Sequence, residues 1–145
     1  MASKNTKSMA QLNHYCQEHQ VKLTPLRADV FNLICKSKQP VTAYELLRQL
    51  RQTKKNAEPP TVYRVLEFLL KANLIHRIET SNAYMMCIHP DEPHHSQIFL
   101  CTSCGDAIEI DSTTIISALQ RSAKNHGFLI ANDLIEIRGK CINCH

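Results

Sequence analysis

The chain of 145 residues is 43% apolar and 21% charged, with a formal net charge of +4, a composition typical of one folded domain or of two small ones. No segment approaches the about 20 consecutive apolar residues of a membrane-spanning helix, and residues 1–20 lack the apolar core of a signal peptide. We therefore expect a cytoplasmic protein. In that reducing compartment, seven cysteines favour metal binding over disulfides.

Charge and metal-binding residue types are distributed unevenly along the chain. Residues 1–80 contain 13 Lys or Arg and 6 Asp or Glu, a balance of +7, whereas residues 81–145 contain 4 and 7, a balance of −3. From His76 onward lie six of the eight histidines and five of the seven cysteines. A basic first part and a second part rich in His and Cys suggest two functions in one chain. The alternative is a charge distribution without functional meaning.

Four amphipathic helices are predicted in the first part of the chain. The second begins at Thr24-Pro25, an N-cap followed by proline, the third at the capping box Thr42-x-x-Glu45, and the fourth at Pro59-Pro60. Apolar residues at helical spacing predict the buried stripes. They are Met9, Leu12 and Cys16; Leu26, Val30, Leu33 and Ile34; Ala43, Leu46, Leu47 and Leu50; and Val62, Leu66, Leu69 and Leu70.

Two strands, 74–79 and 83–88, follow around Ser81-Asn82, which we interpret as a two-residue turn. Helices followed by a hairpin are the order of a winged helix-turn-helix domain, predicted over 1–88. Residues 89–96 contain two prolines and are predicted to form a hinge.

A small αβ domain is predicted over 97–145. Its expected elements are strands 97–101 and 107–111, a helix 112–126 ended by Gly127, and a last strand 128–138. Ile116, Leu119 and Ala123 lie on one face of that helix. The fold class is therefore predicted to be α+β, with a winged helix followed by an αβ domain.

The fourth helix is the candidate for DNA recognition. In helix-turn-helix proteins the second helix of the pair enters the major groove and presents its early residues to the bases. With its leucines inward, Thr61, Tyr63 and Arg64 point elsewhere near its start, and Arg64 could read guanine. Candidate phosphate contacts are Arg27, Tyr44, Lys54, Lys55 and Arg77. The alternative, a solvated helix in a protein-binding winged helix, stays open.

Two Cys-x-x-Cys pairs, Cys101 with Cys104 and Cys141 with Cys144, match a tetrahedral Zn(Cys)₄ site. The 36 residues between the pairs exceed a compact zinc ribbon, so the metal would tie the last strand of the αβ domain to the first. A thioredoxin-like redox pair is expected at a helix N-terminus after a strand. Here the first pair precedes a strand and the second ends the chain, which fits that alternative poorly.

A second metal site is suggested by Cys87. In a hairpin closed symmetrically on Ser81-Asn82, His76 stands opposite Cys87 on the same face, with Cβ atoms about 4.5–5.5 Å apart. Glu109 lies on the face opposite its two isoleucine neighbours, either wet or ligating. Further donors are offered by the linker histidines: His89, His94 and His95. Taken singly, each of these residues is more often solvated or simply buried.

These features resemble the ferric uptake regulator family of metal-sensing repressors over essentially the whole chain, and within it the branch that regulates zinc uptake. The resemblance is carried by KLTPLR (22–27), PPTVYRVLEFLLKANLIHRIE (59–79), Tyr84-x-x-Cys87, the spacing from His94 to the first Cys-x-x-Cys-Gly, and the closing Cys-x-x-Cys. It implies a homodimer, built through the C-terminal αβ domain, that binds an AT-rich inverted-repeat operator when loaded with zinc and represses zinc-uptake genes.

The same resemblance implies two zinc ions per subunit. A structural ion would bind Cys101, Cys104, Cys141 and Cys144, and a regulatory ion would bind His76, Cys87, His94 and Glu109. A third site involving His95 or His126 lacks partner carboxylates at the corresponding positions.

Departures from the family pattern bear on the metal that is sensed. Ser96 and Ile98 stand where histidine is common in the iron sensors, and Leu26 where many members have glutamine. A thiolate ligand favours zinc, whereas Fe(II) and Mn(II) sites lean on nitrogen and oxygen. The alternatives are a sensor of iron, manganese or peroxide in the same family and, from another class, a zinc enzyme or dithiol oxidoreductase. Four protein ligands in the second site leave no position for a catalytic water, so we expect no enzyme.

Overall fold

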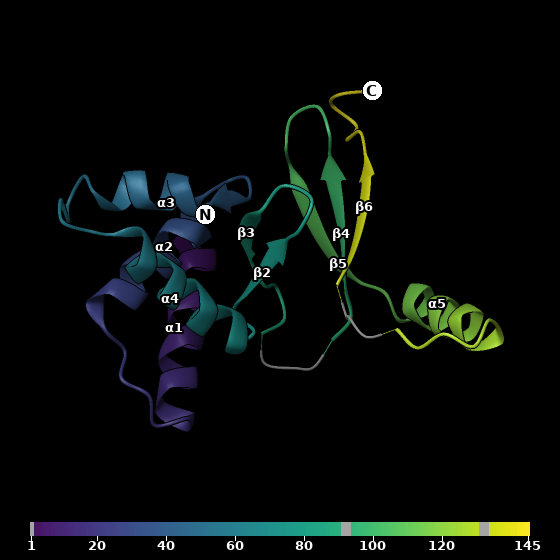
Figure 1. The fold of residues 1–145 in the computed structure, drawn as a ribbon, viewed down its shortest axis with the longest axis horizontal. Helices are drawn as coiled ribbons and strands as arrows, with labels where there is room; N and C mark the ends of the chain where they lie inside the picture. Colours follow the sequence, from purple (N-terminus) through teal and green to yellow (C-terminus); the bar gives the residue numbers. More distant parts are fainter. Residues whose placement is uncertain (1, 91–93, 131–133) are drawn as a thin grey trace. The chain divides into compact units, whose positions relative to one another are not determined.

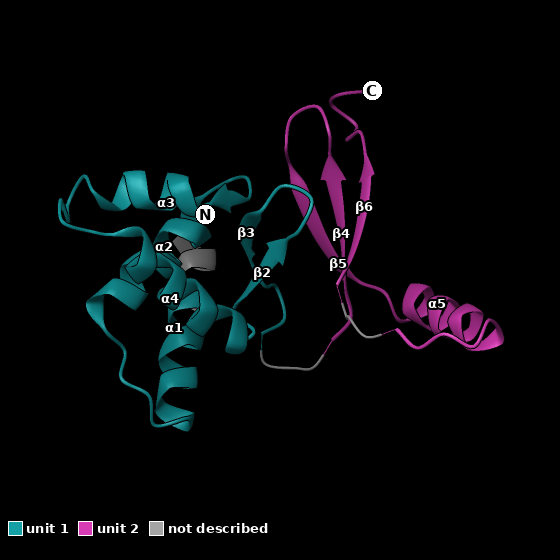
Figure 2. Cartoon of the chain, viewed as in Figure 1, with its two compact units in different colours: residues 1–91 teal, residues 92–145 magenta. Residues whose placement is uncertain are grey.

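The computed structural model describes residues 2–90, 94–130 and 134–145. The chain forms two compact units, Met1–Asp91 and Glu92–His145 (Figures 1 and 2). Both units contain helices and strands among their described residues, which confirms the predicted α+β class. Of the predicted hinge, residues 91–93 lie outside the described residues, and Ser96 already belongs to a strand.

The first unit contains the four predicted helices. Their bounds are α1 (Ala2–Glu18), α2 (Pro25–Lys36), α3 (Ala43–Leu50) and α4 (Pro59–Lys71). The local start signals are confirmed, because the Thr24 side chain accepts a hydrogen bond from the Arg27 amide at 3.2 Å and Thr42 and Glu45 form a reciprocal capping box. α4 begins without a side-chain cap, with proline in its first turn.

The interior of the first unit is built on the apolar faces of these helices. The stripe predicted for α4 is confirmed, since Val62, Leu66 and Leu69 are at most 1% exposed, while Leu70 is only partly buried at its edge. Phe31 of α2, which the predicted stripe omitted, is also 1% exposed. Burial of such side chains contributes about 1.5–3 kcal/mol each, so the position of α4 is set by the core.

The wing is a three-stranded antiparallel sheet of order β1-β3-β2, formed by β1 (Val41–Thr42), β2 (Ile75–Ile78) and β3 (Ala83–Met86). β1 was not predicted. The last residue of β2 lies opposite the first of β3, so four residues form the turn. A two-residue type I′ turn needs positive φ at both positions. Of Ser81-Asn82, only Asn82 has it, at 50°, and the predicted two-residue turn is therefore wrong.

The second unit has the strand order β5-β4-β6, with β4 (Ser96–Cys101) at the centre. β5 (Ala107–Asp111) pairs with β4 antiparallel, and β6 (Ile135–Gly139) pairs with it parallel. The predicted last strand therefore starts later than expected, and its residues 131–133 lie outside the described residues.

Helix α5 (Thr113–Asn125) begins at the Ser112 cap, and Gly127 follows it with a φ of 67°. Of its predicted inner face, Ile116 is buried, whereas Leu119 is 40% exposed. Within the described residues, no helix is long and apolar enough to cross a membrane.

Candidate metal centres and nucleic-acid interface

The two Cys-x-x-Cys pairs meet at one end of the second unit. β4 and β6 run parallel, with Cys101 opposite Gly139, so their C-terminal ends lie at the same edge of the sheet (Figure 1). The Thr102 amide donates to the Gly139 carbonyl at 2.9 Å and joins the two ends. In the turn after β4, Gly105 adopts a φ of 82° and its amide bonds to the Cys101 carbonyl. Pairing over a long chain separation thus brings the predicted cysteines together.

The sulfur atoms of Cys101, Cys104, Cys141 and Cys144 all lie within 4.8 Å of one another. Cys104 Sγ and Cys141 Sγ are 3.8 Å apart, which is the edge of a tetrahedron with Zn–S bonds of about 2.3 Å. A disulfide would require about 2.05 Å, and all seven cysteines are free thiols. The donor set and its spacing fit a closed structural zinc.

Backbone geometry already favours a thiolate in this cluster. Hydrogen bonds from the backbone N–H groups of Cys104 and Cys141 lower the pKa of the Cys101 thiol to about 6. By contrast, hydrogen bonds with the side chains of Cys141 and Cys104 raise the pKa of Cys144 to about 12. Thiolates are the metal-binding form of cysteine, so Cys101 is prepared for a cation at neutral pH.

The first unit holds one half of the predicted regulatory set. His76 lies opposite Met85, not Cys87 as predicted, because the turn spans residues 79–82 and is centred one residue earlier than Ser81-Asn82, which shifts the pairing by two positions. A shift of two residues keeps the side chain on the same face of the hairpin. Cys87 is buried, its amide donates to the Leu74 carbonyl at 2.9 Å, and its Sγ lies within 4.8 Å of a His76 ring nitrogen. The two donors are therefore diagonal neighbours.

The second unit holds the other half. His94 Nε2 lies 3.1 Å from Glu109 Oε1, and the two side chains are 7% and 0% exposed. The alternative that Glu109 is wet is thus excluded. Sequence reasoning missed the third member of this group, Ser96, whose hydroxyl donates to the same oxygen at 2.6 Å. The polar Ser96-Gln97 pair at the start of an apolar strand was the available signal.

The remaining histidines named as possible metal ligands are His95, His126 and His89. The side-chain amide of Gln97 donates to the His95 backbone carbonyl, and its oxygen accepts from the Ser112 amide at 2.8 Å. His126 Nδ1 donates to the Ser122 carbonyl at 2.8 Å. His89 is exposed.

The candidate DNA-reading residues lie along the outer side of α4. Tyr63 is 50% exposed and Arg64 is also exposed, while Thr61 is half-buried. On α3, Tyr44 is 75% exposed. On α4 the exposed Tyr63 and Arg64 side chains lie on the face away from the buried apolar stripe. A helix with such an exposed face can enter the major groove of DNA.

Some of the predicted phosphate contacts serve the fold itself. Arg27 Nη1 donates to the Lys22 carbonyl at 2.6 Å, and its guanidinium carbon lies 3.9 Å over the Phe68 ring. Lys54 pairs with Asp29 at 3.1 Å. The Arg77 Nε donates to Asn82 Oδ1 at 3.2 Å in the turn of the wing. Lys55 is exposed.

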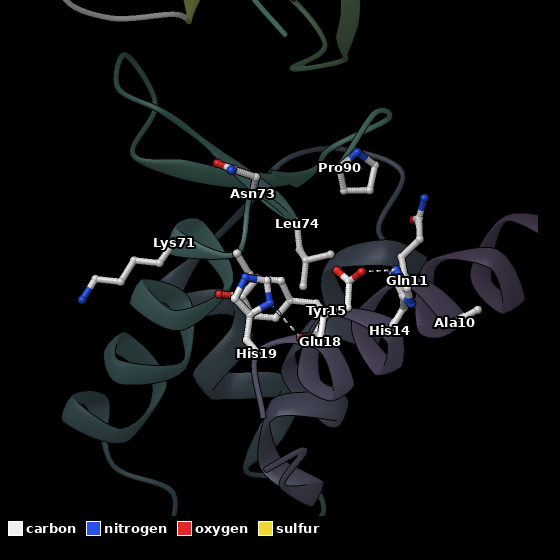
Figure 3. A pocket seen from close by; sticks show the side chains of 11 residues that line it. Ala10, Gln11, His14, Tyr15, Glu18, His19, Lys71, Asn73, Leu74 and Pro90 are labelled. Atoms are coloured by element: carbon white, nitrogen blue, oxygen red, sulfur yellow. Dashed lines mark hydrogen bonds and ion pairs between the residues drawn. The ribbon is translucent and has the colours of Figure 1, made fainter. Parts of the chain in front are cut away.

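A cavity of about 570 Å³ opens in the first unit beside α1 and the end of α4 (Figure 3). His14 pairs with Glu18 at 3.2 Å, and His19 stacks on Tyr15 with ring centroids 4.1 Å apart. Among the described residues, these side chains do not bring three metal-ligating atoms within 4.8 Å of one another.

Comparison with known proteins identifies the fold and its relatives. A model of the ferric uptake regulator family matches residues 18–138. The chain belongs to the ferric uptake regulator family. The zinc uptake regulation protein of Escherichia coli K12 is 36% identical over 137 residues, which cover 94% of this chain and 80% of that protein.

Two solved structures are similar as well. A zinc uptake regulator complexed with zinc and DNA matches with a TM-score of 0.87 at 34% identity, covering 96% of this chain and 93% of the other. Holo XcZur matches with a TM-score of 0.82 at 36% identity, covering 96% of each chain. These matches confirm the family resemblance and the winged-helix architecture read from the sequence.

Proposed function

We propose that the chain is a zinc-responsive transcriptional repressor, which as a zinc-loaded homodimer in the cytoplasm binds an inverted-repeat operator and represses zinc-uptake genes. The observation that carries the proposal is the placement of metal donors on either side of the connection between the units. His76 and Cys87 form a close pair before it, and His94 and Glu109 form another after it. The similarity to zinc uptake regulators supports zinc as the metal.

Two zinc ions per subunit are proposed. The structural ion takes the four cysteines of the second unit, a closed set that leaves no position for water. The regulatory ion takes His76, Cys87, His94 and Glu109, whose thiolate and imidazole donors suit zinc. Since these donors come from both units, zinc would bias the chain toward the states that bind DNA.

DNA recognition is proposed for Thr61, Tyr63 and Arg64 at the start of α4. A bidentate arginine contact to guanine gives about 1–3 kcal/mol of discrimination. Phosphate contacts are proposed for exposed Tyr44 and for Arg27, the latter only through guanidinium donors other than the one bonded to Lys22.

A homodimer through the second unit is supported by its uncovered apolar surface. Phe99 pairs with Ile108 on one side and with Ile137 on the other, which makes an apolar row across the sheet. These three side chains are 42%, 58% and 37% exposed, and Leu129 is 88% exposed. Apolar patches of this kind mark protein interfaces, and a second copy is the partner proposed here.

Two alternatives are less well supported. A sensor of iron, manganese or peroxide would favour nitrogen and oxygen donors over the Cys87 thiolate. An enzyme would need an open metal position, which neither proposed ligand set leaves.

The test is the affinity of the purified chain for operator DNA with and without zinc, together with the zinc content before and after a chelator. We expect zinc to raise the affinity at least about 10-fold, a free-energy coupling of about 1.4 kcal/mol, and a chelator to remove one of two ions. Cys87→Ser should abolish the zinc response and leave the dimer intact. Cys35→Ser, a thiol outside both sets, is the matched control. Equal affinities with and without zinc would refute the proposal.

A further inference from the structure

The buried carboxylate of Glu109 has two polar contacts within the second unit. Its side chain is 0% exposed, and one oxygen, Oε1, contacts both the Ser96 hydroxyl at 2.6 Å and His94 Nε2 at 3.1 Å. Ser96 itself is 2% exposed. All three residues belong to the second unit.

The strand pairing explains why a serine reaches this oxygen. β4 and β5 are antiparallel, with Ile98 opposite Glu109 and Ser96 opposite Asp111. Ser96 is therefore the diagonal neighbour of Glu109 on the same face, close enough for a direct contact between a short and a long side chain. The contact follows from the sheet register and does not depend on a flexible loop.

A hydroxyl in this position has a chemical consequence. It carries a single proton, and donation to Oε1 occupies one lone pair of that oxygen. The carboxylate is thereby held in one orientation, with reduced capacity to bind a cation through both oxygens. Partners of this kind orient metal ligands, and their loss costs typically about 10–100-fold in metal affinity.

We propose that Ser96 is a positioning residue that determines metal specificity at the regulatory site. Its hydroxyl presents Glu109 as a ligand through one oxygen, which suits four-coordinate zinc and disfavours cations that take more oxygen ligands, such as Mn(II). The inference rests on the proposed role of Glu109 as a ligand of the regulatory zinc. A purely structural role, in which the hydroxyl only satisfies a buried carboxylate, would affect all metals alike.

The experiment uses the full chain with its structural zinc retained. Ser96→Ala removes the hydroxyl, Ser96→Thr keeps it on a β-branched residue suited to a strand, and Ser117→Ala removes an exposed hydroxyl from α5 as the control. Zn(II) and Mn(II) affinities at the second site are measured by chelator competition. Co(II) absorption reports the coordination number independently of DNA binding.

We expect Ser96→Ala to weaken zinc binding about 10–100-fold while Mn(II) binding changes far less, and to weaken the intense Co(II) absorption of four-coordination. Ser96→Thr and Ser117→Ala should match the parent. Equal losses for both metals, or an unchanged Co(II) spectrum in Ser96→Ala, would overturn the proposal.

A further variant separates this proposal from the proposed function. If Glu109→Ala loses the second metal but Ser96→Ala keeps its metal preference, the specificity role of Ser96 is wrong and the ligand set stands. If Glu109→Ala retains the second metal with the parent Co(II) spectrum, both the ligand set and the specificity role are wrong.

Discussion

Replacing Arg27 by alanine should destabilise the first unit, because its guanidinium forms a hydrogen bond and a cation–π contact with other residues of that unit. Its hydrogen bond to the Lys22 carbonyl is solvent-exposed and contributes about 1 kcal/mol. Its position 3.9 Å over the Phe68 ring adds about 0.5–1 kcal/mol. The sum, about 1.5–2 kcal/mol, corresponds to a fall in Tm of roughly 10 °C for a unit of this size.

The assay can be confined to the first unit. All four tyrosines, at positions 15, 44, 63 and 84, lie in Met1–Asp91, and the chain has no tryptophan. Thermal unfolding followed by tyrosine fluorescence therefore reports on that unit. Arg27→Lys keeps the charge but not the flat guanidinium, so it should lose most of the same stability.

Arg64→Ala is the matched control, since Arg64 is an exposed arginine of the same unit. It should stay within about 0.5 kcal/mol of the parent in stability and lose DNA affinity by about 1–3 kcal/mol. If Arg27→Ala melts within about 2 °C of the parent, the reasoning from the Phe68 contact is refuted.

Three further predictions concern cysteines and a glycine. Cys101→Ser should lose the structural zinc and leave the second unit open to proteolysis, because the metal contributes folding energy; an unchanged zinc content would contradict this. Burial raises the pKa of the Cys35 thiol to about 11. Its alkylation at pH 8 should therefore be about 100-fold slower than that of a thiol with a pKa of 9. Equal alkylation rates in the native and the unfolded chain would contradict this prediction. Gly127→Ala should destabilise the second unit by about 1 kcal/mol, since φ is 67° there, whereas Gly139→Ala, without positive φ, is the control in the same thermal melt.

Local signals in the sequence predicted the helices correctly, as α3 illustrates. The capping box of Thr42 and Glu45 and the buried leucines that follow are contacts within a few residues, so their energies act whatever the rest of the chain does. The hairpin register was beyond such reasoning. The choice between a two-residue and a four-residue turn depends on backbone angles at Ser81-Asn82 that pattern alone does not specify.

The candidate sites divide in the same way. Sequence by itself determined which side chains can ligate a metal, since donor chemistry belongs to the residue, and it marked the cysteine pairs and Cys87. The tertiary structure decided which of them converge. Parallel pairing of β4 with β6 closes the 36 residues between the Cys-x-x-Cys pairs, and antiparallel pairing of β4 with β5 sets the Ser96 hydroxyl on Glu109. Such contacts join residues far apart in the chain. They form only because tertiary packing offsets the entropy lost in closing the intervening loops, and that packing cannot be read from local sequence patterns.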